Sequence, residues 1–316
     1  MRCAFAFAST NSITQGEQVG VLWRWMLDRG LQIRFAHRTF KWTNGAPGRA
    51  AVHCVIVGFG VADGQPLRTR LFEYPEIDKA PLESLAQSIN PYLADAPDMV
   101  LPARCLARIG NRAPSTCWCL ANRPSAGRTS RWTFCRPMGL VVTPNLCIAQ
   151  AEPDHFCGFS ASMHNAWVRY TCGRLKSDFR YSASIVYNNF PWPRAPDDQH
   201  RTAVVTAAEA VLAARASHAD ASLADLYDPN AMPPNRIKAH RDLDRAVDTA
   251  CLARLPAGMA SKPKLDTDGR RAAFLFTVYA ALATLAAQPD GPGAGWLRMR
   301  VVPESLESAA WKRNRC

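Results

Sequence analysis

Apolar residues in the first part of the chain fall into short runs that are interrupted by one helical stretch. Residues 3–8 form an apolar run that is long enough for a buried strand. Between residues 15 and 29 apolar positions recur every three or four residues, which is the period of a helix, and Gly30 ends it. Residues 31–38 suggest a second strand, and a third, nearly continuous apolar strand follows at 50–59, after Asn-Gly and Pro-Gly pairs that favour turns. This order of strands and helix predicts an α/β fold.

The pattern becomes helical after residue 197. Stretches at 202–216, 236–253 and 269–287 have helical periodicity, and breaks rich in Pro or Gly separate them. The longest apolar run, 272–287, is too short to cross a bilayer and contains two threonines. It therefore predicts a packed helix and no membrane segment.

Residues 99–151 differ from both flanking parts because they contain seven arginines and neither lysine nor acidic residues. Polar and turn-forming residues surround their short apolar runs, so we expect loops. The arginines either contact phosphates or lie on a solvated or out-of-register stretch. They are Arg104, Arg108, Arg112, Arg123, Arg128, Arg131 and Arg136.

Charge and cysteine usage narrow the class of protein. The 316 residues contain 38 Lys and Arg against 26 Asp and Glu, which gives a net charge of +12. A basic chain favours a polyanionic partner, although a GC-rich genome also enriches arginine. Eleven scattered cysteines without a Cys-x-x-Cys pair predict reduced thiols in a bacterial cytoplasm.

Aromatic and basic side chains are interleaved in residues 160–193. Rings can stack on bases and cations can contact phosphates, so the mixture predicts a nucleic-acid surface. A half-buried edge of the core has the same composition and is the alternative. The aromatic residues are Trp167, Tyr170, Phe179, Tyr181, Tyr187, Phe190 and Trp192, and the cations are Arg169, Arg174, Lys176 and Arg180.

A glycine triplet, four cysteines and four histidines could suggest a cofactor, zinc or catalytic site, but each set lacks part of the sequence pattern that such a site requires. Gly58-Phe59-Gly60 follows a strand, yet Asp63 stands where a dinucleotide fingerprint has its third glycine. Four cysteines lack the paired spacing of a zinc site, and four histidines have no serine elbow or His-Glu motif beside them. We therefore expect no catalytic, cofactor or metal site here. These residues are Cys105, Cys117, Cys119, Cys135, His37, His53, His155 and His164.

Six stretches together resemble the MmeI-like adenine-N6 DNA methyltransferases, a family of fused restriction-modification enzymes. They are 4–18, 35–42, 50–59, the segment around Asn90-Pro91-Tyr92, the run that ends in Asn188-Asn189-Phe190-Pro191-Trp192-Pro193, and Leu223-Ala224-Asp225-Leu226-Tyr227-Asp228-Pro229 with Met232-Pro233-Pro234. The resemblance implies the closing strands of an incomplete class I methyltransferase sheet in residues 1–64. A shortened target-recognition region in 65–193 and a helical domain in 194–316 would follow.

The family's F-x-G-x-G cofactor loop and N-P-P-[FY] catalytic segment do not occur in this sequence. The resemblance therefore implies the C-terminal portion of an enzyme that methylates adenine N6 from S-adenosylmethionine, inactive alone and without a metal. Its implied partners are double-stranded DNA and an N-terminal methyltransferase half. The alternatives are a stand-alone DNA-binding module that is paired with a separately encoded catalytic half, and a non-functional remnant.

The resemblance also implies particular site residues. A base that is flipped out of the duplex needs an aromatic platform, and Phe40 occupies the matching place, with Trp42 as a nearby substitute. The alternative is that Phe40 caps the sheet edge. The implied DNA contacts are Arg169, Arg174, Lys176, Arg180, Tyr181, Asn188 and Asn189.

An incomplete sheet also has consequences for stability. We expect the strand at 50–59 to lie beside an open edge, so that the chain aggregates or requires an N-terminal partner. The helical part from residue 197 is expected to fold alone.

Overall fold

The fold was analysed in a computed structural model of the chain. It describes residues 4–42, 52–62, 68–74, 80–103, 109–110, 118–121, 133–135, 146–148, 153–175, 178–192, 197–218, 220–228, 230–256 and 258–286. Among these residues, no helix is long and apolar enough to cross a membrane.

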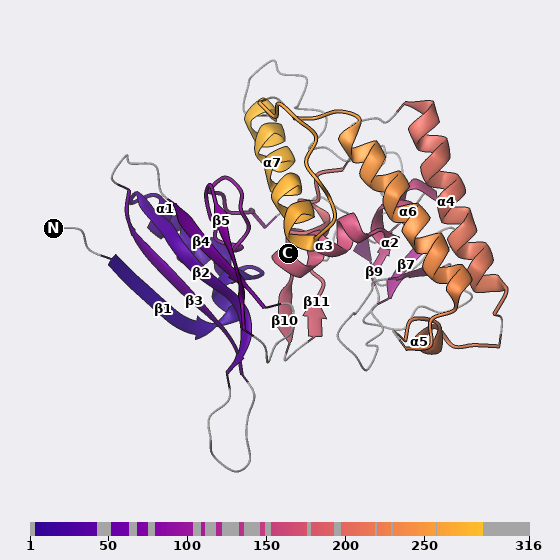
Figure 1. The fold of residues 1–316 in the computed structure, drawn as a ribbon, viewed down its shortest axis with the longest axis horizontal. Coiled ribbons are helices and arrows are strands. Elements are labelled where there is room, and N and C mark those ends of the chain that lie inside the picture. Colours follow the sequence, from indigo (N-terminus) through magenta and orange to yellow (C-terminus); the bar gives the residue numbers. More distant parts are fainter. Residues whose placement is uncertain are drawn as a thin grey trace, which may run out of the picture.

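A five-stranded mixed sheet forms the first part of the molecule (Figure 1). Its strands lie in the order β1-β3-β2-β4-β5, with β3 antiparallel to both β1 and β2. β2 and β4 are parallel, and β5 is antiparallel to β4. The strands are β1 (Ala4–Thr10), β2 (Leu31–Trp42), β3 (Val52–Val61), β4 (Thr69–Glu73) and β5 (Leu82–Ala86). The predicted α/β pattern of this region is confirmed.

The position of the open edge differs from the expectation. The apolar run at 50–59 becomes β3, which is hydrogen-bonded on both sides, and β1 forms the edge of the sheet instead. The reason is that β3 returns antiparallel from the β2–β3 hairpin and inserts between β1 and β2. β1 and β2 are therefore parallel to each other and are joined through a helix, which is the usual connection in α/β proteins.

The helix between β1 and β2 covers one face of the sheet. η1 (Asn11–Thr14) leads into α1 (Gln18–Leu27), whose Val19, Trp23 and Met26 are buried. The Trp23 ring lies edge-on to Phe59 of β3, with the ring centroids 6.3 Å apart. Gly30 follows the helix with a φ of 72°, a conformation that glycine adopts without strain. The helical period in the sequence therefore predicted α1 correctly.

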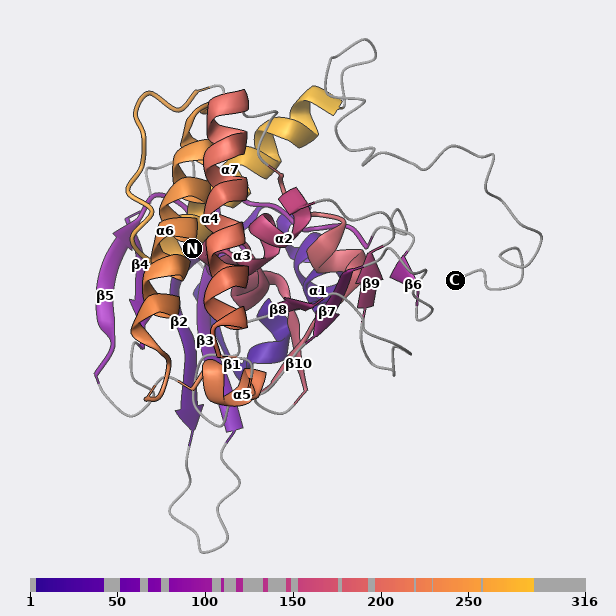
Figure 2. The same cartoon turned by 90° about the vertical axis from the view of Figure 1, so that its right-hand side faces the viewer.

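Helices build the second part of the molecule, beside the sheet (Figures 1 and 2). They are α2 (Pro153–Ser160), α3 (Ser162–Thr171), the π-helical turn η2 (Ala183–Tyr187), α4 (Asp198–Ala216), α5 (Leu223–Leu226), α6 (Pro234–Leu252) and α7 (Asp268–Ala286). Figure 2 shows α4 and α6 lying side by side. The sequence predicted α4, α6 and α7 to within a few residues.

Short strands complete the fold. β10 (Gly173–Leu175) and β11 (Asp178–Arg180) form an antiparallel ribbon after α3. Another sheet, of order β6-β9-β7-β8, lies in the arginine-rich stretch where we expected loops. Its strands are β6 (Ile109–Gly110), β7 (Trp118–Ala121), β8 (Thr133–Cys135) and β9 (Leu146–Ile148). The seven arginines of this stretch lie outside the described residues.

Aromatic packing joins α7 to α3 and to Tyr92. Trp167 of α3 is fully buried, and its ring lies 4.9 Å from that of Phe276 in α7. Phe276 also stacks on Tyr92 at 5.2 Å. α7 is therefore part of the same core as α3, although about a hundred residues of sequence separate the two helices.

Candidate nucleic-acid interface

The ribbon β10–β11 carries the basic side chains that best match the predicted DNA contacts. Arg174 and Phe179 are direct cross-strand partners, and the Arg174 guanidinium lies 4.2 Å from the centre of the Phe179 ring. Burial, together with the positive charges of Arg38 and Arg169, lowers the pKa of Arg174 to about 10, against the opposite effect of Cys172. Arg180 is exposed at the end of β11. The ribbon therefore concentrates positive charge next to an aromatic ring.

Two side chains from the sheet, the cation Lys41 and the imidazole of His53, extend this basic surface. Lys41 of β2 and His53 of β3 are direct cross-strand partners, so their side chains lie on the same face of the sheet. Burial lowers the pKa of His53, and the charges of Arg174 and Lys41 lower it further. We call Lys41, His53 and Arg174 the basic cluster. Its charges suit a DNA phosphate.

Sequence reasoning missed Lys41 and His53 as members of this interface. The hairpin pattern around residues 43–51 could have paired the two strands, and a Lys opposite a His at the strand ends was a usable signal. No local pattern could have placed Arg174 near them, because more than a hundred residues separate β3 from β10.

Phe40 lies on the opposite face of the sheet from Lys41, since neighbouring strand residues point to opposite faces. Its ring centre lies 5.3 Å from that of Tyr74 and 6.2 Å from that of Trp42, which is 54% exposed. His37 stacks on Phe72 at 4.2 Å, and its Nδ1 is 2.9 Å from the Tyr74 hydroxyl. Phe40 is thus one ring in a half-buried aromatic row, a geometry that accommodates both base stacking and capping of the sheet.

Two predicted DNA contacts instead have their side chains engaged inside the protein. Asn189 is 2% exposed, and its amide group donates to the carbonyl oxygens of Pro102, Ser184 and Ile185. Its Oδ1 accepts a hydrogen bond of 3.0 Å from the Tyr279 hydroxyl. The side chain of Asn189 is therefore part of an interior hydrogen-bond network.

The hydroxyl of Tyr181 lies 3.1 Å from Nε2 of the fully buried His164. Burial raises the pKa of Tyr181 well above its usual value and lowers that of His164 to about 3. Tyr181 therefore contributes to the core through its hydroxyl, and His164 is a neutral core histidine.

The remaining predicted contacts occupy different environments. Arg169 is half-buried and forms an ion pair with Asp268 at the start of α7. Asn188 is half-buried at the end of η2, where its backbone N–H donates to the Ala183 carbonyl. Lys176 lies outside the described residues. Arg174 and Arg180 therefore remain the predicted contacts that lie on the ribbon itself.

The glycine motif has a packing explanation. Gly58 lies in the middle of β3, and a Cβ atom there would come within 2.0 Å of the Phe35 ring. The motif therefore makes room for Phe35 and does not form a phosphate-binding loop. In the described part of the chain, no group of three His, Cys, Asp or Glu side chains could hold a metal ion. The side chains of the four cysteines considered for zinc and of His155 are outside the described set.

Comparison with protein families gives three matches along the chain. Residues 1–73 match the DNA-methyltransferase domain of MmeI, 132–194 its target recognition domain and 195–286 its C-terminal domain. These are the parts of a DNA methyltransferase that carries its own target recognition domain. The chain belongs to the MmeI family.

Two individual relatives support this assignment. DNA methyltransferase A of Bacillus subtilis (strain 168) is 28% identical over 351 residues, in an alignment that covers 78% of this chain and 39% of the relative. A solved structure of the Type IIL restriction-modification enzyme MmeI in complex with DNA matches with a TM-score of 0.74 and 32% identity. It covers 89% of this chain and 50% of the MmeI chain. The chain therefore spans half the length of these relatives or less.

Proposed function

We propose that this chain recognises double-stranded DNA at specific sites as part of an adenine-N6 methyltransferase of the bacterial cytoplasm. The observation that carries the proposal is the basic cluster of Lys41, His53 and Arg174, next to the exposed Arg180. The cluster combines Lys41 and the His53 imidazole of the methyltransferase-like sheet with Arg174 of the ribbon, and phosphate contacts of this kind position a protein on a duplex. The family match supports the same role.

The proposed contact set differs from the predicted one. Arg174, Arg180 and Lys176 of the ribbon region are retained, and Lys41 and His53 are added. Arg169 and Asn188 remain as flanking candidates, since both are half-buried. Asn189 and Tyr181 are left out because their side chains serve the core. Phe40, with Trp42 beside it, is the proposed platform for a flipped adenine.

The methyl donor of the family is S-adenosylmethionine, and the described residues do not fit a site for it. Such a site needs a glycine-rich loop after a strand, so that backbone N–H groups can approach the cofactor. Within the described residues, the one Gly-x-Gly triplet, Gly58-Phe59-Gly60, lies inside β3 with a paired strand on each side. We therefore derive no catalytic step from these residues.

An N-terminal methyltransferase segment is the proposed protein partner. β1 has the alternating Ala and Phe sequence of a strand in the interior of a sheet, yet it forms an edge. The alignments also cover only 39% and 50% of the lengths of the two relatives. A strand supplied by that segment would cover β1.

The recognition region is proposed to be shorter than that of the relative from Bacillus subtilis. The alignment extends over 351 residues but occupies only 78% of this 316-residue chain, so the relative carries a long stretch that this chain lacks. The basic cluster and ribbon would then supply a larger share of the DNA contacts.

The salt dependence of DNA binding tests the proposed contacts. Each phosphate contact contributes a slope of about −0.9 to the plot of log affinity against log salt concentration. The substitutions Arg174→Ala, Arg180→Ala and Lys41→Ala are each expected to reduce the magnitude of the slope by about one unit. Fluorescence anisotropy with a labelled duplex at several salt concentrations measures it.

Arg245→Ala is the matched control, because Arg245 is highly exposed on α6 and pairs with Asp242. Its slope should equal that of the unmodified chain. An unchanged slope in all three interface variants would remove the ribbon and the basic cluster from the DNA interface.

A further inference from the structure

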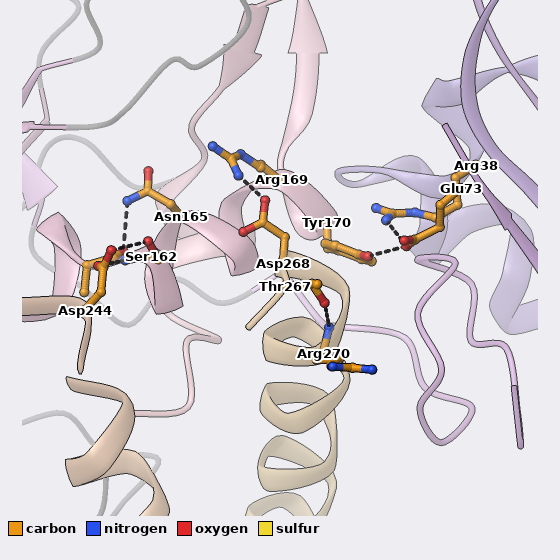
Figure 3. Close-up of polar contacts among 11 residues, drawn as sticks. Arg38, Glu73, Ser162, Asn165, Arg169, Tyr170, Asp244, Thr267, Asp268 and Arg270 are labelled. Carbon is orange, nitrogen blue, oxygen red and sulfur yellow. Dashed lines mark hydrogen bonds and ion pairs between the residues drawn. The ribbon is translucent and has the colours of Figure 1, made fainter. Parts of the chain in front are cut away.

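A polar junction connects the sheet to the two helices α3 and α7 (Figure 3). Arg38 of β2 donates a hydrogen bond of 2.7 Å to Glu73 at the end of β4. The hydroxyl of Tyr170 in α3 donates to the same carboxylate oxygen at 3.3 Å. The Arg38 guanidinium also lies 3.8 Å from the centre of the Tyr170 ring. Two strands and one helix thus meet at a single carboxylate.

The start of α7 closes the junction from the other side. Asp268 pairs with Arg169, the residue before Tyr170, and Thr267 Oγ1 accepts a hydrogen bond from the Arg270 backbone N–H, which caps the helix. A Cβ atom at Gly269 would lie 3.1 Å from the Tyr170 hydroxyl and 3.2 Å from Glu73. The helix therefore approaches so closely that a larger residue would have to displace these groups.

The junction fixes the position of the ribbon β10–β11 relative to the end of β2, which are two parts of the proposed DNA interface. Arg38 lies two residues before Phe40 in the same strand, and Tyr170 lies four residues before Arg174 of the ribbon. The close approach of Gly16 to Gly173, where a Cβ atom on Gly16 would lie 3.1 Å from the Gly173 Cα atom, restrains the ribbon from a second point. Tyr170 is 2% exposed, and burial raises its pKa, so its hydroxyl stays protonated as a donor.

We propose that Tyr170 is a positioning residue that, through Glu73 and Arg38, holds the recognition ribbon in a fixed place relative to Phe40. The role rests on the proposed DNA-recognition function. In a site-specific complex the ribbon and the flipped-base platform must contact one duplex at a defined spacing, whereas non-specific binding to phosphates does not require this. The hydroxyl of Tyr170 should therefore affect the specificity of binding more than its strength.

Tyr170→Phe isolates this role, because it keeps the ring under Arg38 and removes only the hydroxyl. A hydrogen bond to a charged group changes an equilibrium about tenfold or more. The ratio of affinities for the preferred duplex and a scrambled duplex is therefore expected to fall about tenfold in this variant. Non-specific affinity for the scrambled duplex should stay within about twofold.

Tyr227→Phe is the matched control. The Tyr227 hydroxyl accepts a hydrogen bond of 2.7 Å from Arg215 and lies 3.2 Å from His240 Nε2, among the C-terminal helices. This variant also loses one tyrosine hydroxyl from a polar network, but it should retain the specificity ratio. Hydrogen exchange gives a readout without DNA: amides of β10 and β11 should exchange faster in Tyr170→Phe and not in Tyr227→Phe.

The outcomes separate the two proposals. The preferred duplex would come from selection with the full chain on a pool of random-sequence duplexes. If the unmodified chain shows no preference, the proposed function fails and the positioning role fails with it. If the unmodified chain has a preference that Tyr170→Phe retains in full, or that Tyr227→Phe loses equally, only the positioning role is overturned.

Discussion

Replacement of Asn189 by Ala is expected to lower the free energy of unfolding by about 3 kcal/mol or more, because it leaves several buried groups without hydrogen-bond partners. The amide of Asn189 connects three backbone carbonyls with the Tyr279 hydroxyl, and it thereby joins η2, the segment around Pro102 and α7. Tyr279→Phe removes only one of these bonds and should cost less. Urea denaturation monitored by tryptophan fluorescence measures both.

Gln18→Ala provides the comparison, since it removes an exposed amide at the start of α1. Its effect should stay within about 0.5 kcal/mol, as for most surface substitutions. If Asn189→Ala were as mild as this control, the side chain would be free to reach the surface, and the original prediction of a DNA contact at Asn189 would regain support.

The free edge of β1 is expected to cause self-association of the isolated chain at micromolar concentrations. An exposed, flat, apolar strand edge pairs readily with other chains, and natural edges are usually protected by Lys, Pro or a bulge. Ala4–Thr10 has none of these: its register with β3 is unbroken over all seven residues, and Phe5 and Phe7 are 55% and 37% exposed. The double substitution Phe5→Lys with Phe7→Lys should convert the associated species to a monomer in size-exclusion chromatography with light scattering.

Val21→Lys is the control for this experiment. Val21 is 82% exposed on α1, so this substitution also replaces an exposed apolar side chain by lysine, but on a helix and not on the edge strand. It should leave the association unchanged. A monodisperse monomer of the unmodified chain at the same concentration would contradict the role of β1 as an unsatisfied edge.

The packing of the helices after residue 197 changes the expectation that this part of the chain folds alone. The ring of Phe276 in α7 packs against both Trp167 and Tyr92, which lie outside this part of the chain. Tyr279 likewise bonds to Asn189. A fragment that begins at residue 197 would expose these contacts, so the structure argues against its folding alone.

The elements that the sequence predicted well are those with local causes. Strands β1 and β3 are largely apolar, β2 begins with alternating apolar and polar residues, and α1 has a regular helical period that ends near Gly30. The turn-forming residues between 43 and 48 predicted a turn between the strands that became β2 and β3. The family resemblance, which rested on the order of particular residues, was also confirmed.

Tertiary packing decides which side chains of the aromatic and basic residues in 160–193 are buried and which are exposed. α3 is buried on nearly all sides, so that polar His164 and Asn165 are as inaccessible as Trp167. Composition cannot separate such a helix from a surface that binds nucleic acid, because both contain rings beside polar groups. Among the described residues of this run, exposed positive charge remains at Arg180, in the ribbon that follows α3.

Sequence-selective DNA binding by the full chain tests the central claim most directly. The purified chain, kept monomeric by the β1 substitutions if necessary, would be incubated with a pool of random-sequence duplexes at moderate salt, and the bound fraction sequenced over successive rounds. We expect enrichment of one short sequence, with reduced enrichment in a variant that lacks both Arg174 and Arg180. Binding that stays equally strong for all sequences, or no binding at all, would contradict a role in target recognition.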